Sequence, residues 1–168
     1  TDSNGLYGLN IEWGSTGDSI HAIKSTYIAN AGIRIATSSN DNTLNGNVSM
    51  SNGVYGFELN ASGNLTMTNN LSCSNTSQGF FLSSSSFNVV TGNTARSNAS
   101  VGFAIATTCT SNRFADNRSE SNVGAAGHGF ELTSSSMNVF NRNSAYNNSQ
   151  HGFMVSTSVN NRFDGNTV

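Results

Sequence analysis

The sequence of 168 residues contains no proline and few charged side chains. Proline cannot donate a hydrogen bond to a β-ladder, so its absence is compatible with long, uninterrupted ladders. Charged residues make up 10% of the chain, and the formal net charge is −2. A protein that binds the phosphate backbone of nucleic acids presents a basic face, so this composition argues against nucleic acid as a partner.

Cysteine and long apolar runs are also scarce. The two cysteines, Cys73 and Cys109, fall at different positions of the internal repeat described below. A disulfide requires Cα atoms within about 7 Å of each other, so we expect two free thiols. No apolar run approaches the roughly 18 residues that a membrane-spanning helix needs, and we expect no membrane span.

The chain does contain a repeat, in which a glycine followed by a large apolar residue returns every 23 to 27 positions. The glycines that mark it are Gly8, Gly32, Gly56, Gly79, Gly102, Gly129 and Gly152. Between them asparagine recurs at every fifth residue, as in Asn88, Asn93 and Asn98. Self-similar units of this length are the signature of a solenoid.

Within each unit, apolar residues alternate with polar ones over short segments, which is the period of a β-strand. Aligning the units gives three columns of large apolar residues and one of small residues, all predicted to face the core. The large columns are Leu9, Ile33, Phe57, Phe80, Phe103, Phe130, Phe153; then Ile11, Ile35, Leu59, Leu82, Ile105, Leu132, Val155; then Ile20, Leu44, Met67, Val90, Phe114, Phe140, Phe163. The small column is Ser25, Ser49, Ser72, Ala95, Ser119, Ala145.

These columns predict an all-β fold. Stacked coils pair in parallel about 4.8 Å apart, and the crossover preference of parallel strands makes the solenoid right-handed. We therefore predict a right-handed, single-stranded parallel β-helix of about seven coils of 23–27 residues. It forms one domain over residues 1–168, either a segment of a longer solenoid or a unit that stacks end to end.

Asparagine columns are predicted to form ladders at the bends between strands. Asparagine tolerates left-handed backbone, its amide bonds to the main chain, and stacked asparagines bond to one another along the axis. The most regular column is Asn47, Asn70, Asn93, Asn117, Asn143 and Asn166. One coil is longer, because Asn122 to Gly129 is 7 residues where other coils have 4, and we expect the extra residues to bulge from a corner.

The coil pattern, as in NTLNGNVSMSNGVYGFELNAS and NVFNRNSAYNNSQHGFMVSTS, resembles the parallel β-helix repeats of the NosD-like proteins. It is also similar to the wider carbohydrate-binding and sugar-hydrolase β-helix group, which includes C5-epimerases. The resemblance covers almost the whole chain. It implies a β-helix, an extracellular, cell-surface or periplasmic setting, and polysaccharide as ligand, and it provides no catalytic motif that can be placed on this chain.

Candidate ligand-binding residues lie at the outward position between the two core columns of the glycine strand. Arg34 and Glu58 occupy adjacent coils and can pair, Phe81 beside Glu58 offers a surface for a sugar ring, and Glu131 occupies the same column. We predict these four as ligand-binding residues. The alternative is a solvated wall with a surface ion pair, which contributes about 0–1 kcal/mol.

A candidate metal site is formed by His128 and His151, which precede the repeat glycine on adjacent coils. Their rings are predicted to lie roughly 5 Å apart, and two imidazoles at that distance can share a transition metal. The copper connection of the NosD-like proteins adds to this hypothesis. No third ligand occupies the column, so the alternative is a pair of exposed bend histidines, and no cofactor is predicted.

Three functions follow from these observations. Acidic residues are sparse, whereas epimerases, lyases and hydrolases need a base, a cation or a pair of carboxylates. We therefore predict a non-catalytic structural or adhesive β-helix of a secreted or cell-surface protein that binds polysaccharide. Two alternatives stay open: a portion of a polysaccharide lyase, epimerase or hydrolase whose acidic residues lie outside the segment, and a self-assembling fibre subunit whose uncapped coils stack on other copies.

Overall fold

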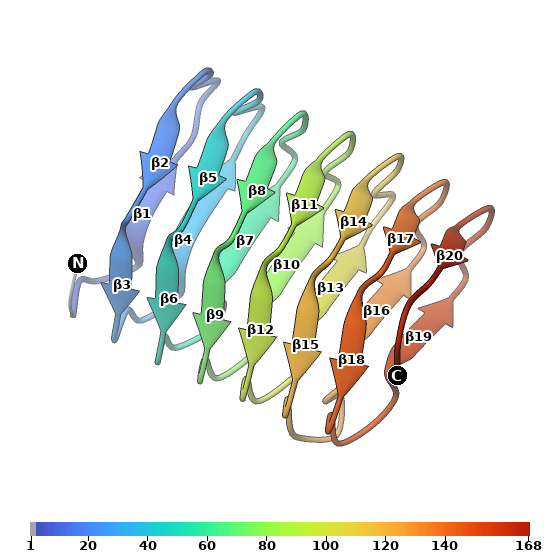
Figure 1. The fold of residues 1–168 in the computed structure, drawn as a ribbon. Helices are drawn as coiled ribbons and strands as arrows, with labels where there is room; N and C mark the ends of the chain where they lie inside the picture. The colour runs from blue at the N-terminus through green and yellow to red at the C-terminus, as the bar shows by residue number, and fades with distance from the viewer. Residues whose placement is uncertain (1–2) are drawn as a thin grey trace.

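In a computed structural model that describes residues 3–168, the chain winds into the predicted right-handed β-helix (Figure 1). The coils stack along one axis, with the N-terminal end of the chain at one end of the stack and the C-terminal end at the other. Each full coil contributes one strand to each of three parallel sheets. Residues 3–168 contain no helix, and so none in that range is long and apolar enough to cross a membrane.

The first sheet has seven strands, each beginning at or near the repeat glycine. They are β1 (Tyr7–Ile11), β4 (Ala31–Ala36), β7 (Phe57–Asn60), β10 (Phe80–Ser83), β13 (Phe103–Ala106), β16 (Phe130–Thr133) and β19 (Phe153–Ser156).

The other two sheets are made of three-residue strands. The second sheet contains β2 (Ser19–His21), β5 (Thr43–Asn45), β8 (Thr66–Thr68), β11 (Val89–Thr91), β14 (Arg113–Ala115), β17 (Val139–Asn141) and β20 (Arg162–Asp164). The third contains β3 (Lys24–Thr26), β6 (Val48–Met50), β9 (Leu71–Cys73), β12 (Thr94–Arg96), β15 (Arg118–Glu120) and β18 (Ser144–Tyr146).

The core confirms the predicted columns, because each member pairs with its counterpart on the next coil. Phe80 is opposite both Phe57 and Phe103, and Val90 is opposite both Met67 and Phe114. Rings in one column stack face to face, with centroids 4.6 Å apart for Phe80 and Phe103. Burial of large side chains along the whole axis provides the main driving force for this fold.

The repeat glycine and the small column depend on each other. The Ser49 and Ser72 hydroxyls donate hydrogen bonds of 2.7 Å and 2.8 Å to the carbonyls of Gly56 and Gly79. A Cβ added at Gly56 would lie 2.0 Å from the Ser72 hydroxyl oxygen, which is closer than any real contact. The chain therefore needs glycine at this point and a small residue in the coil that packs against it.

The predicted asparagine ladders are present and buried. Asn93 is typical: its backbone N–H and its Nδ2 both donate to Asn117 Oδ1, at 2.9 Å and 3.1 Å. Its Nδ2 also donates to the Met67 carbonyl at 2.9 Å, and its Oδ1 accepts from the backbone N–H of Asn70 at 2.9 Å. One side chain thus satisfies polar groups on three successive coils, which matters because an unpaired buried polar group is costly.

The expectation that the ladder asparagines themselves adopt the left-handed backbone conformation is wrong by one position. The residue with positive φ is the one before each ladder asparagine: Gly46, Asn69 and Gly92 have φ of 65°, 55° and 66° and precede Asn47, Asn70 and Asn93. The left-handed residue turns the chain, and the asparagine that follows places its amide inside the coil. Most residues at these positions are not glycine, so the ladders hold a conformation that side chains ordinarily disfavour.

A fourth ladder, which the sequence reading missed, consists of serine hydroxyls at the corner after the first sheet. The Ser62 hydroxyl accepts from the Ser39 N–H at 3.2 Å and donates to the Asn60 carbonyl at 3.3 Å. Cys109 takes a serine position, since its sulfur accepts from the Ser85 N–H at 3.3 Å. The signal for this ladder was the run of serine and threonine that follows most of the glycine strands, as in residues 37–39 and 83–86.

Two smaller expectations are confirmed. Cys73 and Cys109 are both free and buried. The extra residues of the long coil bulge from a corner, with Val123, residues 124–125 and Ala126 all exposed.

Candidate functional site

The outer face of the first sheet carries aromatic and charged side chains over its first four strands. These six residues are termed the first-sheet patch: Tyr7, Glu12, Arg34, Tyr55, Glu58 and Phe81. Strand pairing places Arg34 opposite Glu58, and Glu58 opposite Phe81. The fold therefore brings three of the four predicted ligand-binding residues together on adjacent coils.

Arg34 is at the centre of the polar half of the patch. Its Nη1 donates to Glu12 Oε2 at 2.9 Å and to Asn10 Oδ1 at 3.1 Å, and its Nε lies 3.3 Å from Glu58 Oε2. The guanidinium also lies 5.1 Å from the centroid of the Tyr7 ring, within range of a cation–π interaction. The expected pairing of Arg34 with Glu58 is present, and Glu12 is a second partner that the sequence reading missed.

Neighbouring groups shift the pKa of two residues in the patch. The hydrogen bond with Asn10, and then the contacts with Arg34, lower the pKa of the Glu12 carboxyl below its ordinary value. Burial raises the pKa of the Tyr55 phenol, and the Glu58 carboxylate raises it further. At neutral pH the patch therefore has an ionised Glu12 and a neutral Tyr55 hydroxyl that can donate a hydrogen bond.

The apolar half of the patch is a stacked pair of rings. Tyr55 lies just before β7, and Phe81 lies on β10. Their ring centroids are 4.8 Å apart and their planes are 17° apart. Both side chains are partly exposed. An aromatic surface next to fixed hydrogen-bonding groups suits a ligand that has one apolar face and many hydroxyls.

Glu131 lies outside this patch. Along the outward column, Phe81 pairs with Ala104 and Ala104 pairs with Glu131, so Glu131 is three coils from Glu58. Its Oε1 accepts a hydrogen bond from the Thr133 hydroxyl at 3.2 Å. A ligand-binding role for Glu131 stays a prediction and would belong to a different part of the face.

The two histidines are adjacent, as expected from their shared column. Their rings stack with centroids 5.2 Å apart and planes 6° apart, and the backbone N–H of His151 donates to His128 Nδ1 at 3.2 Å. Parallel rings direct their in-plane nitrogen lone pairs side by side, and one of these is already occupied. No group of three or more His, Cys, Asp or Glu side chains suited to a metal occurs within residues 3–168, and metal binding by this pair stays a prediction.

Comparison with known families identifies the class of protein. Residues 10–168 match the family described as the right-handed beta helix region, and the chain belongs to this family. A comparison with curated protein sequences finds no match.

Several solved structures share this fold. The A-module of a mannuronan C-5 epimerase from Azotobacter vinelandii has a TM-score of 0.84 at 19% identity, over 88% of this chain and 41% of that one. A periplasmic alginate epimerase has a TM-score of 0.78 at 23% identity, over 88% of this chain and 35% of that one. A pectate lyase has a TM-score of 0.54 at 19% identity, over 86% and 45%. The chain thus spans less than half the length of these proteins, and at such identities the likeness is one of fold.

Proposed function

We propose that this β-helix binds a neutral polysaccharide along the outer face of the first sheet, in a structural or adhesive role without catalysis. The observation that carries the proposal is the stacked pair of Tyr55 and Phe81 beside the Arg34 network. The partly exposed ring pair offers an apolar surface to the apolar side of a sugar, and the polar groups offer partners to its hydroxyls. The three structures named above are a mannuronan epimerase, an alginate epimerase and a pectate lyase, each named for a polysaccharide, which supports a polysaccharide as the partner.

The charge of the patch favours a neutral polymer over a polyuronate. Glu12 and Glu58 supply two carboxylates and Arg34 supplies one guanidinium, which is already paired with both. Carboxylates of an incoming polymer would be repelled, and no cation in the patch is left to receive them. An extracellular or periplasmic setting fits this proposal, and one of the similar structures is described as periplasmic.

Affinity electrophoresis through gels that contain a neutral glucan or a polyuronate tests the proposal. We expect the neutral polymer to retard the protein, and Phe81→Ala and Tyr55→Ala to weaken binding about tenfold, since each loses a stacking surface. Tyr146→Ala is the matched control, because Tyr146 is a partly exposed aromatic residue on β18 of the third sheet, away from the first-sheet face. Stronger retardation by the polyuronate, or unchanged retardation of both aromatic variants, would contradict the proposal.

A second candidate is a portion of a polysaccharide lyase, epimerase or hydrolase. It is supported by Tyr55 and Glu58, two groups capable of proton transfer that lie beside Arg34 on one face. Incubation of the protein with each polysaccharide, followed by NMR of the products, distinguishes the two. New unsaturated ends, inverted C5 centres or new reducing ends that disappear in Glu58→Gln would establish the enzyme.

A further inference from the structure

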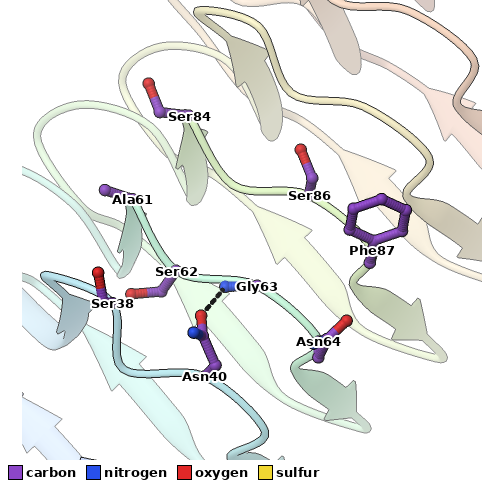
Figure 2. Close-up of a pocket in the computed structure, with 9 residues that line it drawn as sticks. All are labelled: Ser38, Asn40, Ala61, Ser62, Gly63, Asn64, Ser84, Ser86 and Phe87. Atoms are coloured by element: carbon purple, nitrogen blue, oxygen red, sulfur yellow. Dashed lines mark hydrogen bonds between the residues drawn. The ribbon is translucent and has the colours of Figure 1, made fainter. Parts of the chain in front are cut away.

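A pocket lies at the corner where the chain leaves the first sheet and turns toward the second (Figure 2). It has a volume of about 310 Å³, at the small end of the range for ligand sites. Three successive coils line it, after β4, β7 and β10, and it shares no residue with the first-sheet patch. The lining residues are Ser38, Asn40, Ala61, Ser62, Gly63, Asn64, Ser84, Ser86 and Phe87.

The lining of this corner pocket is polar and uncharged, and part of its hydrogen-bonding capacity is unused. Asn40 Oδ1 accepts from the Gly63 N–H at 2.7 Å, which leaves the Nδ2 group of that amide as a donor. The Ser86 hydroxyl oxygen accepts from the Thr110 N–H at 2.9 Å and keeps its own hydrogen. Within residues 3–168, the exposed side chains of Ser38, Asn64 and Ser84 have no hydrogen-bond partner, so the lining has both donors and acceptors available to a ligand.

Among residues 3–168, Phe87 is the one aromatic residue that lines the pocket. It has φ of 61°, in the left-handed region that costs a bulky residue about 1–3 kcal/mol. It is 63% exposed, so its ring gains little from burial. Five other coils have residues at this position that suit the conformation better, and one other coil has the bulky, exposed Met137. The five are Gly17, Asp41, Asn64, Ser111 and Asn160. A disfavoured, exposed aromatic beside a pocket indicates a role in binding.

We propose that the corner pocket binds a sugar unit of a neutral saccharide, with Phe87 as the stacking surface. Asn40, Asn64, Ser38, Ser84 and Ser86 then exchange hydrogen bonds with the sugar hydroxyls. Among residues 3–168, no Lys, Arg, Asp or Glu lines the pocket, which argues against a phosphate or a carboxylate as the ligand because such groups are bound through charge-assisted hydrogen bonds. The three coils span roughly 10 Å along the axis, enough for one or two sugar rings.

NMR titrations test this proposal, with tetragalacturonate as the charged comparison. The neutral sugars are cellotetraose, maltotetraose and tetra-N-acetylchitotetraose, each titrated into the whole chain in a separate sample. We expect at least one of them to shift the amide signals of Gly63, Ser84 and Ser86 in a saturable way. Phe87→Asn should weaken that binding about tenfold or more, as loss of a base-stacking aromatic does in other proteins. Asparagine suits the left-handed conformation, as Asn64 shows on the preceding coil, so this variant keeps the fold.

Met137→Asn is the matched control, because Met137 occupies the same position two coils on, with φ of 57° and 54% exposure, and does not line the pocket. It should leave the titration unchanged. The double variant Tyr55→Ala, Phe81→Ala separates this site from the first-sheet patch, and it too should leave the corner shifts intact. Absence of saturable shifts at the corner for all three sugars would overturn the proposal. So would equal binding by Phe87→Asn, or equal binding of tetragalacturonate.

Discussion

A buried side chain in this molecule contacts its own counterparts on the coils above and below. The Phe103 ring lies 4.6 Å from that of Phe80 and 4.8 Å from that of Phe130. Removal of one ring therefore leaves a cavity between two others. The strands of this sheet cannot close the cavity without breaking the hydrogen bonds between coils. The cost of such a substitution should lie at the upper part of the range for buried aromatics.

Phe103→Ala is expected to lower the free energy of unfolding by about 3–5 kcal/mol, because it leaves a cavity in the core. Glu131→Ala, at the outward position of the next coil, is expected to change it by about 0.5 kcal/mol or less. Urea unfolding followed by circular dichroism measures both. Similar losses at the two positions would show that the inward and outward assignment is wrong.

Cys109→Ser is expected to change stability by less than about 1.5 kcal/mol, because serine fills this ladder position in neighbouring coils. Burial raises the pKa of the Cys109 thiol above its ordinary value of 9.0. The unfolded chain therefore loses this proton first, and stability falls as the pH rises from the unfolded pKa through the folded pKa.

The Cys109→Ser variant should not show this fall in stability at alkaline pH. Thermal unfolding between about pH 7 and pH 10 compares the two proteins, since the free thiol titrates in this range. Tyr55 also has a raised pKa, but its contribution begins only near 10.0 and is common to both proteins. Identical pH profiles would show that the Cys109 thiolate is accommodated in the folded state.

At each turn between strands, one residue adopts the left-handed conformation and the asparagine after it makes the ladder hydrogen bonds. Asn93→Ala should lower the free energy of unfolding by about 3 kcal/mol or more, because the backbone N–H of Asn70 and the Met67 carbonyl lose their hydrogen-bond partner inside the coil. Asn69→Gly, directly before a ladder residue, should change stability by about 1 kcal/mol or less, because Gly46 and Gly92 adopt the same conformation. Thermal unfolding of both variants checks the division, and a larger loss at Asn69 would contradict it.

The elements that sequence reading recovered are those whose columns repeat in one chemical type. The Phe80 and Asn93 columns qualify, and the sheets and ladders built on them were predicted in register. The left-handed positions were misplaced by one residue because residues as different as Gly92 and Arg142 occupy them.

The candidate site was harder to predict for a related reason. Glu12 does not belong to the outward column, because it lies two residues beyond the column's position in its coil and just after the end of β1. The corner pocket is made of serine and asparagine, the commonest residues of the repeat, and only their arrangement across three coils distinguishes them.

The molecule as a whole depends little on charge. Three of its ion pairs, Arg118–Glu120, Arg142–Asp116 and Arg162–Asp164, involve side chains that are largely exposed on at least one partner. Exposed pairs contribute about 0–1 kcal/mol, and salt screens them. Raising sodium chloride from about 0.1 M to 1 M should therefore shift the unfolding temperature by less than about 4 °C. If calorimetry showed a large fall in the unfolding temperature at high salt, the stability would come from electrostatic interactions and not from the core.

Self-association through the ends of the coil stack stays a prediction. In the last coil Val155 is 46% exposed and Phe163 is 42% exposed, while their counterparts Leu132 and Phe140 are fully buried. Self-association predicts that another copy stacked on this coil covers both side chains. Electron microscopy and light scattering on the intact native protein distinguish these outcomes: fibres with a continuous stack support self-assembly, and discrete monomers of a longer chain contradict it.

The long coil shows how this architecture accommodates new material. Asn122 still donates to Asn148 and still accepts from Asn98, although the chain makes a detour through residues 123–128 directly after it. Each coil therefore keeps the same cross-section as the coil before it. A corner of one coil can lengthen without breaking the hydrogen bonds to the coils on either side. Variation in the gene at such corners can alter the outer surface freely, so lineages of this protein should diverge in their corner loops long before they diverge in the stack beneath.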